Sequence, residues 1–199
     1  MKAIDAIFNR RSIRKFEDKV IPKETIEKIL LSGMSAPSSK NRQPWSFIVF
    51  EGDEKKQMLE VFRKGANDEF NNPKLLPNSG KFESGTRYTL DIMEQSPTVV
   101  FVYNPFGKSP IENLSLEEKF YEMANLQCFG DCMENMSIAA TALGIGSLWI
   151  CDIYFAYNEL ANWLNIDGQL VACMAFGYPA ESPKQRPRKK IENIVEWRV

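Results

Sequence analysis

Residues 10–16 read Arg-Arg-Ser-Ile-Arg-Lys-Phe and directly follow a short helix that we expect over residues 2–9. Four of the seven side chains are cationic and one is a hydroxyl. One guanidinium group can donate to two phosphate oxygens at once, and a serine hydroxyl adds another donor. A basic helix end in solvent explains the same composition, because the helix dipole favours cations there. Taken alone, the segment leaves a phosphate site and a solvated surface both open.

Two further basic runs show that positive charge is concentrated in short segments of the chain. The 199 residues carry 25 Lys and Arg against 26 Asp and Glu, a net charge of −1. Residues 10–15, 40–42 and 184–190 hold eleven of the basic residues and no acid, so the remainder has 14 basic and 26 acidic residues, a net charge of −12. An acidic body argues against a nucleic-acid partner, which calls for a broadly basic domain. If the basic runs converge, they suit one compact anion such as a phosphate.

The 199 residues contain no histidine, which excludes several kinds of enzyme. Ser-His-Asp and Cys-His relays cannot be built, and neither can histidine-liganded zinc. An enzyme of this composition needs another source of chemistry, and a bound cofactor is the simplest one. The four cysteines form no CxxC pair, so we expect buried free thiols and no metal site.

The hydrophobic pattern predicts a protein of the cytoplasm with no membrane partner. No apolar run approaches the ~18 residues of a membrane span. The first sixteen residues are interrupted by Asp5, so they do not have the pattern of a signal peptide.

Periodicity predicts a single domain over residues 1–199 with a small sheet. The expected helices cover residues 2–9, the stretch after Ile21-Pro22, residues 54–64 with Asp53 as the cap, 117–143 ending at Gly144, and 157–164. The expected strands cover residues 45–50, 97–103, 147–151 and 169–178. Helices come first, and the strands are then separated by helices and long loops, which indicates an α+β or α/β fold.

The middle and the end of the chain carry two further expectations. Residues 65–95 are polar and rich in Pro, Gly and Asn, so we interpret them as a loop or lid with room for short helices, and residues 104–115 as another loop. Together they make 65–115 a variable region. Residues 194–197 are apolar and have no obvious strand to pair with in their own chain, so they can add to the sheet of a second copy and form a dimer by terminal exchange.

Three other segments carry polar or glycine patterns that each have two explanations. Residues 37–45 can hydrogen-bond a heterocycle edge or a polyol chain, or form an ordinary polar loop. Residues 144–150 follow a helix and precede a strand, the reverse of a dinucleotide fingerprint, and also fit a helix end followed by a core strand. Residues 186–190 read as a basic tail or a nucleic-acid patch, although their prolines argue against a flexible tail.

In this order and spacing, four segments resemble the nitroreductase family of FMN-dependent oxidoreductases. They are RRSIRKF at 10–16, APSSKNRQPW at 36–45, ALGIGSLWI at 142–150, and FGYP at 176–179 followed by RPRKK at 186–190. The resemblance covers nearly the whole chain, but residues 65–115 match nothing in it. It implies an α+β fold with a small, mainly antiparallel sheet flanked by helices, and a homodimer with an exchanged C-terminal strand.

The resemblance also implies three groups of cofactor-binding residues. The FMN phosphate and ribityl chain would be held by Arg10, Arg11, Ser12, Arg14, Arg186 and Arg188, with Lys189 left open. The isoalloxazine and ribityl chain would be lined, from one protomer of the dimer, by Pro37, Ser38, Ser39 and Asn41. The other face or edge of the flavin would be covered, largely through backbone atoms, by Trp149, Ile150 and Cys151. Asn67 is a further possibility that stays unassigned.

The activity implied is hydride transfer from NADH or NADPH to flavin N5, and then to nitroaromatics, quinones or related electrophiles, by a ping-pong mechanism. The flavin carries this chemistry, so no catalytic side chain is expected, and Arg14 is a candidate for tuning the flavin at N1. The alternatives are a specialised flavin enzyme (a reductive dehalogenase, an enone reductase or a flavin-cleaving enzyme), a flavin-binding or redox-sensing protein without turnover, and a small nucleic-acid module that uses RPRKK. The sequence does not choose between NADH and NADPH or name the substrate.

Overall fold

The structure is a computed structural model that describes residues 2–198. Its centre is a four-stranded antiparallel sheet in the order β1-β2-β4-β3. The strands are β1 (Ser46–Phe50), β2 (Thr98–Asn104), β4 (Gln169–Gly177) and β3 (Gly146–Ile150). Each lies within a residue or two of its predicted bounds, and the antiparallel sheet confirms the α+β expectation. The two inner strands, β2 and β4, are mostly apolar and buried along almost their whole length, because both faces of the sheet are covered.

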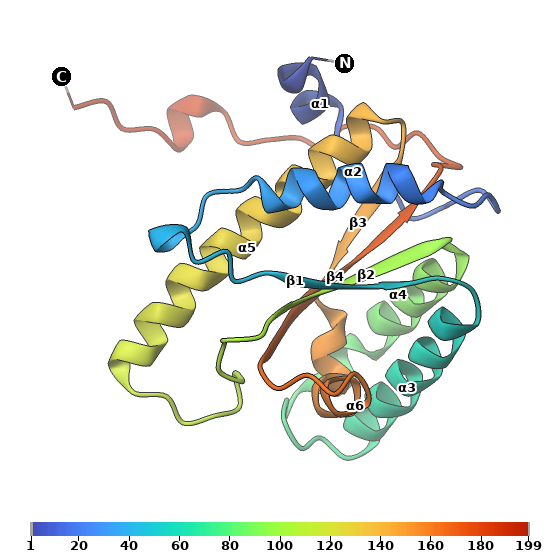
Figure 1. The fold of residues 1–199 in the computed structure, drawn as a ribbon, viewed down its shortest axis with the longest axis vertical. Helices are drawn as coiled ribbons and strands as arrows, with labels where there is room; N and C mark the ends of the chain where they lie inside the picture. The colour runs from blue at the N-terminus through green and yellow to red at the C-terminus, as the bar shows by residue number, and fades with distance from the viewer. Residues whose placement is uncertain (1, 199) are drawn as a thin grey trace.

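Helices pack on both faces of this sheet, as Figure 1 shows. One face carries α2 (Lys23–Met34) and α5 (Leu116–Ala142), with α1 (Ala3–Asn9) against α5. The other carries α3 (Gly52–Asn71), α4 (Glu83–Gln95) and α6 (Tyr157–Trp163). Along β2 the side chains alternate between the two cores: Val99 and Phe101 face α3 and α4, whereas Val100 and Val102 face α2 and α5.

The long helix α5 begins and ends where its sequence signals it. Ser115 and Glu118 form a reciprocal capping box at its start. After its end, Gly144 has a φ of +77°, a conformation that favours glycine. Two of its thiols, Cys128 and Cys132, are buried as expected, and so is Cys173 on β4. Cys151 is exposed, so the expectation of buried thiols is wrong at that position.

The prediction of a loop over residues 65–95 is wrong for most of their length, which is more helical than the short helices allowed for; a role of this region as a lid stays a prediction. Helix α3 continues to Asn71, and α4 occupies Glu83–Gln95. The apolar stripe of α3 continues through Gly65 and Ala66, which are buried but too small to register as hydrophobic periodicity. Only the connection between the two helices is irregular, and the carboxylate of Glu69 binds it by accepting from the amides of Lys74, Leu75 and Leu76.

One smaller expectation also needs correction. Asp53 does not cap α3, because the helix already begins at Gly52 and the Asp53 carboxylate pairs with Lys56 at 2.7 Å. Residues 194–197 form no strand within the described chain: after β4 the chain is extended, with a single turn η4 (Ile191–Asn193), and it projects from the body of the molecule past α1 (Figure 1). Exchange of this segment with a second copy stays a prediction. None of the described helices is long and apolar enough to cross a membrane.

Candidate functional site

The first and third basic runs meet in one cavity of about 330 Å³. The N-terminal segment contributes four residues that the sequence singled out, and the C-terminal segment contributes two more of them. The lining residues are Arg10, Arg11, Ser12, Arg14, Pro183, Lys184, Gln185, Arg186 and Arg188. The structure thus brings together all six residues that were predicted to hold a phosphate.

Backbone pairing brings these two distant segments into contact. Ser12 pairs with Ser147 of β3, and the amide of Ile13 donates to the carbonyl of Ser147 at 2.9 Å. Just beyond, the amide of Ala180 donates to the carbonyl of Lys15 at 2.9 Å, so the chain leaving β4 runs beside the same segment. The approach of Ile13 to β3 requires a glycine: a Cβ on Gly146 would lie 2.9 Å from the Ile13 side chain. The glycine-rich junction before β3 therefore serves packing next to the cavity.

The cationic side chains of the cavity differ in whether they already have ion-pair or hydrogen-bond partners within the protein. Arg10 pairs with Glu134 at 3.0 Å. Arg11 donates to the carbonyls of Phe8 and Arg10, at 2.7 and 2.8 Å, and so caps the end of α1.

The four other cations, within residues 2–198, form no ion pair with an acid. They are Arg14, Lys184, Arg186 and Arg188. Glu181 accepts from the Arg14 amide at 2.5 Å, whereas the Arg14 guanidinium donates to the carbonyl of Ser12 at 3.3 Å. Four uncompensated cations and a serine hydroxyl suit a phosphate dianion.

Sequence reasoning missed Lys184 and left Lys189 open. Lys184 lines the cavity, whereas Lys189 is exposed and does not. Lys184 belongs to the basic run 184–190, so its charge was the available signal, but the resemblance rested on the later RPRKK residues.

The strand next to the cavity has a free edge. β3 is an outer strand of the sheet, and beyond Ser147 no other part of residues 2–198 pairs with its outer side. The Ile150 side chain is buried in the core, the Trp149 side chain is 40% exposed, and Cys151 is exposed. Although the residue as a whole is exposed, its thiol is partly buried, and this burial raises the pKa of Cys151. An edge of this kind offers backbone donors and acceptors to a planar polar ring, which is compatible with the predicted role of these three residues.

The polar loop at Pro37–Asn41 lies elsewhere. It forms the turn η1 (Ser39–Asn41) after α2, and Figure 1 shows it at the far end of α2, well away from α1 and the start of β3. None of the four predicted residues lines the cavity. The turn is held in an unusual shape, with positive φ at Lys40, Asn41 and Gln43, and the Gln43 amide donates to Ser38 Oγ at 3.0 Å. Within one chain the predicted site is therefore incomplete.

Asn67 also lies away from the cavity. It sits on α3, where its Oδ1 accepts from Arg87 of α4 at 3.0 Å. A contact that the sequence did not suggest lies directly after the free strand: Thr89 Oγ1 of α4 donates to Asp152 Oδ2 at 2.5 Å. The partners are far apart in sequence, and no local signal marks either of them.

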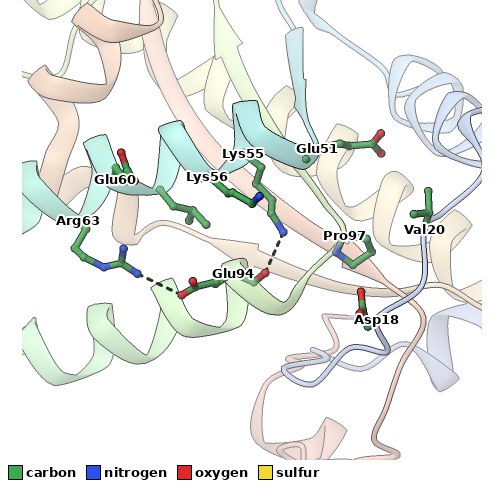
Figure 2. Close-up of a pocket in the computed structure, with 11 residues that line it drawn as sticks. Asp18, Val20, Glu51, Lys55, Lys56, Glu60, Arg63, Glu94 and Pro97 are labelled. Carbon is green, nitrogen blue, oxygen red and sulfur yellow. Dashed lines mark hydrogen bonds and ion pairs between the residues drawn. The ribbon is translucent and has the colours of Figure 1, made fainter.

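A larger cavity, of about 590 Å³, opens between α3 and the end of α4 (Figure 2). Its central side chain is the buried Lys55, whose Nζ donates to the carbonyls of Glu94, at 3.0 Å, and Ser96. Both carbonyls lie at the C-terminal end of α4, so Lys55 acts as a cap for that helix. Burial lowers the pKa of this lysine. Among the charged side chains around it, Arg63 pairs with Glu94 at 3.4 Å, and Lys56 pairs with Asp53 at 2.7 Å.

Comparison with known proteins matches the Nitroreductase family model over residues 7–178. A relative from Archaeoglobus fulgidus, which carries the provisional name NADH dehydrogenase/NAD(P)H nitroreductase, is 34% identical over 186 residues, covering 90% of this chain and 87% of its own. A provisionally named nitroreductase from Desulfovibrio desulfuricans, solved in complex with FMN, has a TM-score of 0.73 and 26% identity, covering 100% of this chain and 98% of its own. A BluB-like flavoprotein from Clostridium difficile 630 shares the fold, with a TM-score of 0.80 and 24% identity over the whole of both chains.

Proposed function

Since the chain belongs to the nitroreductase family, we propose that it is an FMN-dependent oxidoreductase that takes a hydride from NADH or NADPH and passes it to nitroaromatics, quinones or related electrophiles. The observation that carries the proposal is the single cavity in which the two basic segments meet. The name of the Archaeoglobus relative and the FMN complex of the Desulfovibrio protein support it.

The residues present fit FMN. The phosphate would be held by Ser12, Lys184, Arg186 and Arg188, and Arg14, the remaining cation without an acid partner, would lie along the ribityl chain toward flavin N1. Arg10 and Arg11 would support this group from the end of α1, where their own partners already orient them. The free backbone edge at Trp149–Cys151 would receive the polar edge of the ring. When bound, FMN supplies the hydride chemistry, and the protein contributes position and charge.

The site is completed by a second copy of the chain in this proposal. Pro37, Ser38, Ser39 and Asn41 lie too far from the cavity of their own chain to line it, so they would serve the cavity of the partner. Exposed apolar side chains support a dimer: Phe8 of α1 is 64% exposed, Phe120 of α5 60%, and Trp197 of the C-terminal segment 76%. Residues 194–197 would pack on the partner. We expect the dimer to work in the cytoplasm, where its thiols stay reduced.

Measurements on the purified protein test this function. The protein should be yellow, heat should release FMN rather than FAD, and NADH or NADPH should bleach it in the absence of oxygen. Initial rates with a quinone should give parallel lines, as ping-pong exchange of two substrates in one site requires. A colourless protein that FMN does not reconstitute contradicts the proposal, and a yellow protein that neither nicotinamide bleaches contradicts turnover.

Light scattering should give twice the chain mass, and removal of residues 191–199 should weaken the dimer.

A further inference from the structure

Asp152 holds a fixed position at the end of the free strand. It is the first residue of the turn η3 (Asp152–Ala156), which directly continues β3 through Cys151. Its Oδ2 accepts from Thr89 of α4 at 2.5 Å. The same turn is held by Phe155, whose ring lies between Phe70 of α3 and Phe82, with centroid distances of 5.3 and 5.5 Å. The carboxylate therefore has little freedom to swing away from the strand end.

The charge of Asp152 is not neutralised by a neighbour. Within residues 2–198 it takes part in no ion pair. Arg87, two residues before Thr89, is engaged with Glu83 at 2.7 Å and with Asn67. The Asp152 side chain is partly exposed, and its second oxygen accepts no hydrogen bond from the described residues. Asp152 directly follows Cys151, and its charge contributes, after burial, to raising the pKa of the Cys151 thiol.

We propose that Asp152 is a specificity-determining residue that disfavours anionic electron acceptors. The inference rests on the proposed function, which puts the flavin ring beside Trp149–Cys151 and so puts the acceptor near the next residue, Asp152. A fixed negative charge at the edge of a partly desolvated site repels a carboxylate and leaves a neutral ring of the same shape almost unaffected. The cationic cavity lies at the phosphate end of the site, so the two ends of the site have opposite charge.

The test compares a matched pair of ligands that do not turn over. Dissociation constants of benzoate and benzamide are measured by calorimetry on the oxidised, FMN-loaded protein. Asp152→Asn keeps the shape and can still accept from Thr89, but it removes the charge. It should tighten benzoate about tenfold and leave benzamide within about twofold. The kcat/KM for 4-nitrobenzoate relative to 4-nitrobenzamide should rise by a similar factor, and added salt should shrink the difference between variant and wild type.

Two further variants make the result decisive. Thr89→Val removes the hydrogen bond and keeps the charge, so its benzoate-to-benzamide ratio should stay close to that of the wild type. Asp152→Ser is a second neutral variant and should behave as Asp152→Asn does, even if one of the two loses stability. An FMN-loaded, benzamide-binding protein whose ratio is the same in the wild type and both neutral variants overturns this inference alone. A protein that binds neither FMN nor benzamide overturns the proposed function, and the inference with it.

Discussion

The amide of Ile13 donates to the carbonyl of Ser147 at 2.9 Å, and this bond joins the basic N-terminal segment to the outer strand of the sheet. It sets the Arg10–Arg14 segment against the start of β3. The free edge at Trp149–Cys151 follows further along the same strand. A phosphate group and a planar ring bound at these two places would be separated by a short stretch of β3. The geometry of the site thus depends on one close backbone contact.

Gly146→Ala should disturb that contact. A Cβ at this position would lie 2.9 Å from the Ile13 side chain, which must then move together with Ser12. We expect a loss of about 1–3 kcal/mol in the free energy of unfolding, measured by urea denaturation, and weaker FMN binding. Gly85→Ala in α4 is the matched control, because nothing lies within 4 Å of the added Cβ. It should leave FMN binding unchanged and keep or slightly raise stability; equal behaviour of the two variants would count against the role of the contact.

Arg14→Ala should make the bound flavin harder to reduce. Its guanidinium has no acid partner in the described chain, and a positive charge near flavin N1 stabilises the anionic reduced ring. The two-electron midpoint potential should fall by about 30 mV or more, equivalent to roughly 1.4 kcal/mol. A redox titration against a reference dye measures it, with Lys189→Ala as the control outside the cavity. A potential equal to that of the wild type would remove Arg14 from this role.

Alkylation of Cys151 tests where the ring lies. Cys151 is an exposed residue, although partial burial of its thiol raises the pKa, while burial raises the pKa of Cys132 to about 12 and makes it unreactive. In the apoprotein, iodoacetamide should therefore modify Cys151 well before Cys132, as peptide mass spectrometry can show. FMN should slow modification of Cys151 several-fold. Equal rates with and without FMN would place the ring away from Trp149–Cys151.

Lys55→Met should destabilise the fold without affecting FMN. It leaves the carbonyls of Glu94 (Figure 2) and of Ser96 without their donor, at a cost of about 1–3 kcal/mol. Burial lowers the pKa of Lys55 below its ordinary 10.5, so the unfolded chain binds the proton more tightly than the folded one. Stability then rises with pH between the folded pKa and 10.5, and that gain is lost as pH falls through the folded pKa. The wild type should show this slope relative to Lys55→Met in denaturation at pH 7–10; parallel pH profiles would contradict it.

The strands and the long helix could be predicted because their signals are local. Residues 98–104 and 169–177 are apolar runs of strand length, and Gly144 marks the end of α5. The helical nature of residues 65–71 was hidden because Gly65 and Ala66 fill the buried face where α3 approaches Ala156 and Glu159. Small residues carry little hydrophobic signal, although the close packing of two elements demands them.

The candidate site, too, has parts that could be predicted from the sequence and parts that could not. The meeting of residues 10–14 with 186–188 followed from the resemblance, since a basic run cannot by itself indicate which distant run it contacts. The pairing of Thr89 with Asp152 could not be predicted, because neither residue has a local pattern. In the proposed dimer, Pro37–Asn41 would serve the cavity of a second copy of the chain, and periodicity within one sequence contains no information on that arrangement.

The affinity for FMN of two neighbouring variants tests the central claim most directly. Arg188 lines the cavity and has no acid partner within the described residues, whereas Lys189 is exposed outside it. Titration of the apoproteins, followed by the quenching of FMN fluorescence, should show one FMN per chain. Arg188→Ala should weaken binding at least about tenfold, as expected for a lost charge-assisted contact to phosphate, and Lys189→Ala should stay within about twofold of the wild type. Equal affinities for the wild type and both variants would contradict the claim that this cavity holds the FMN phosphate.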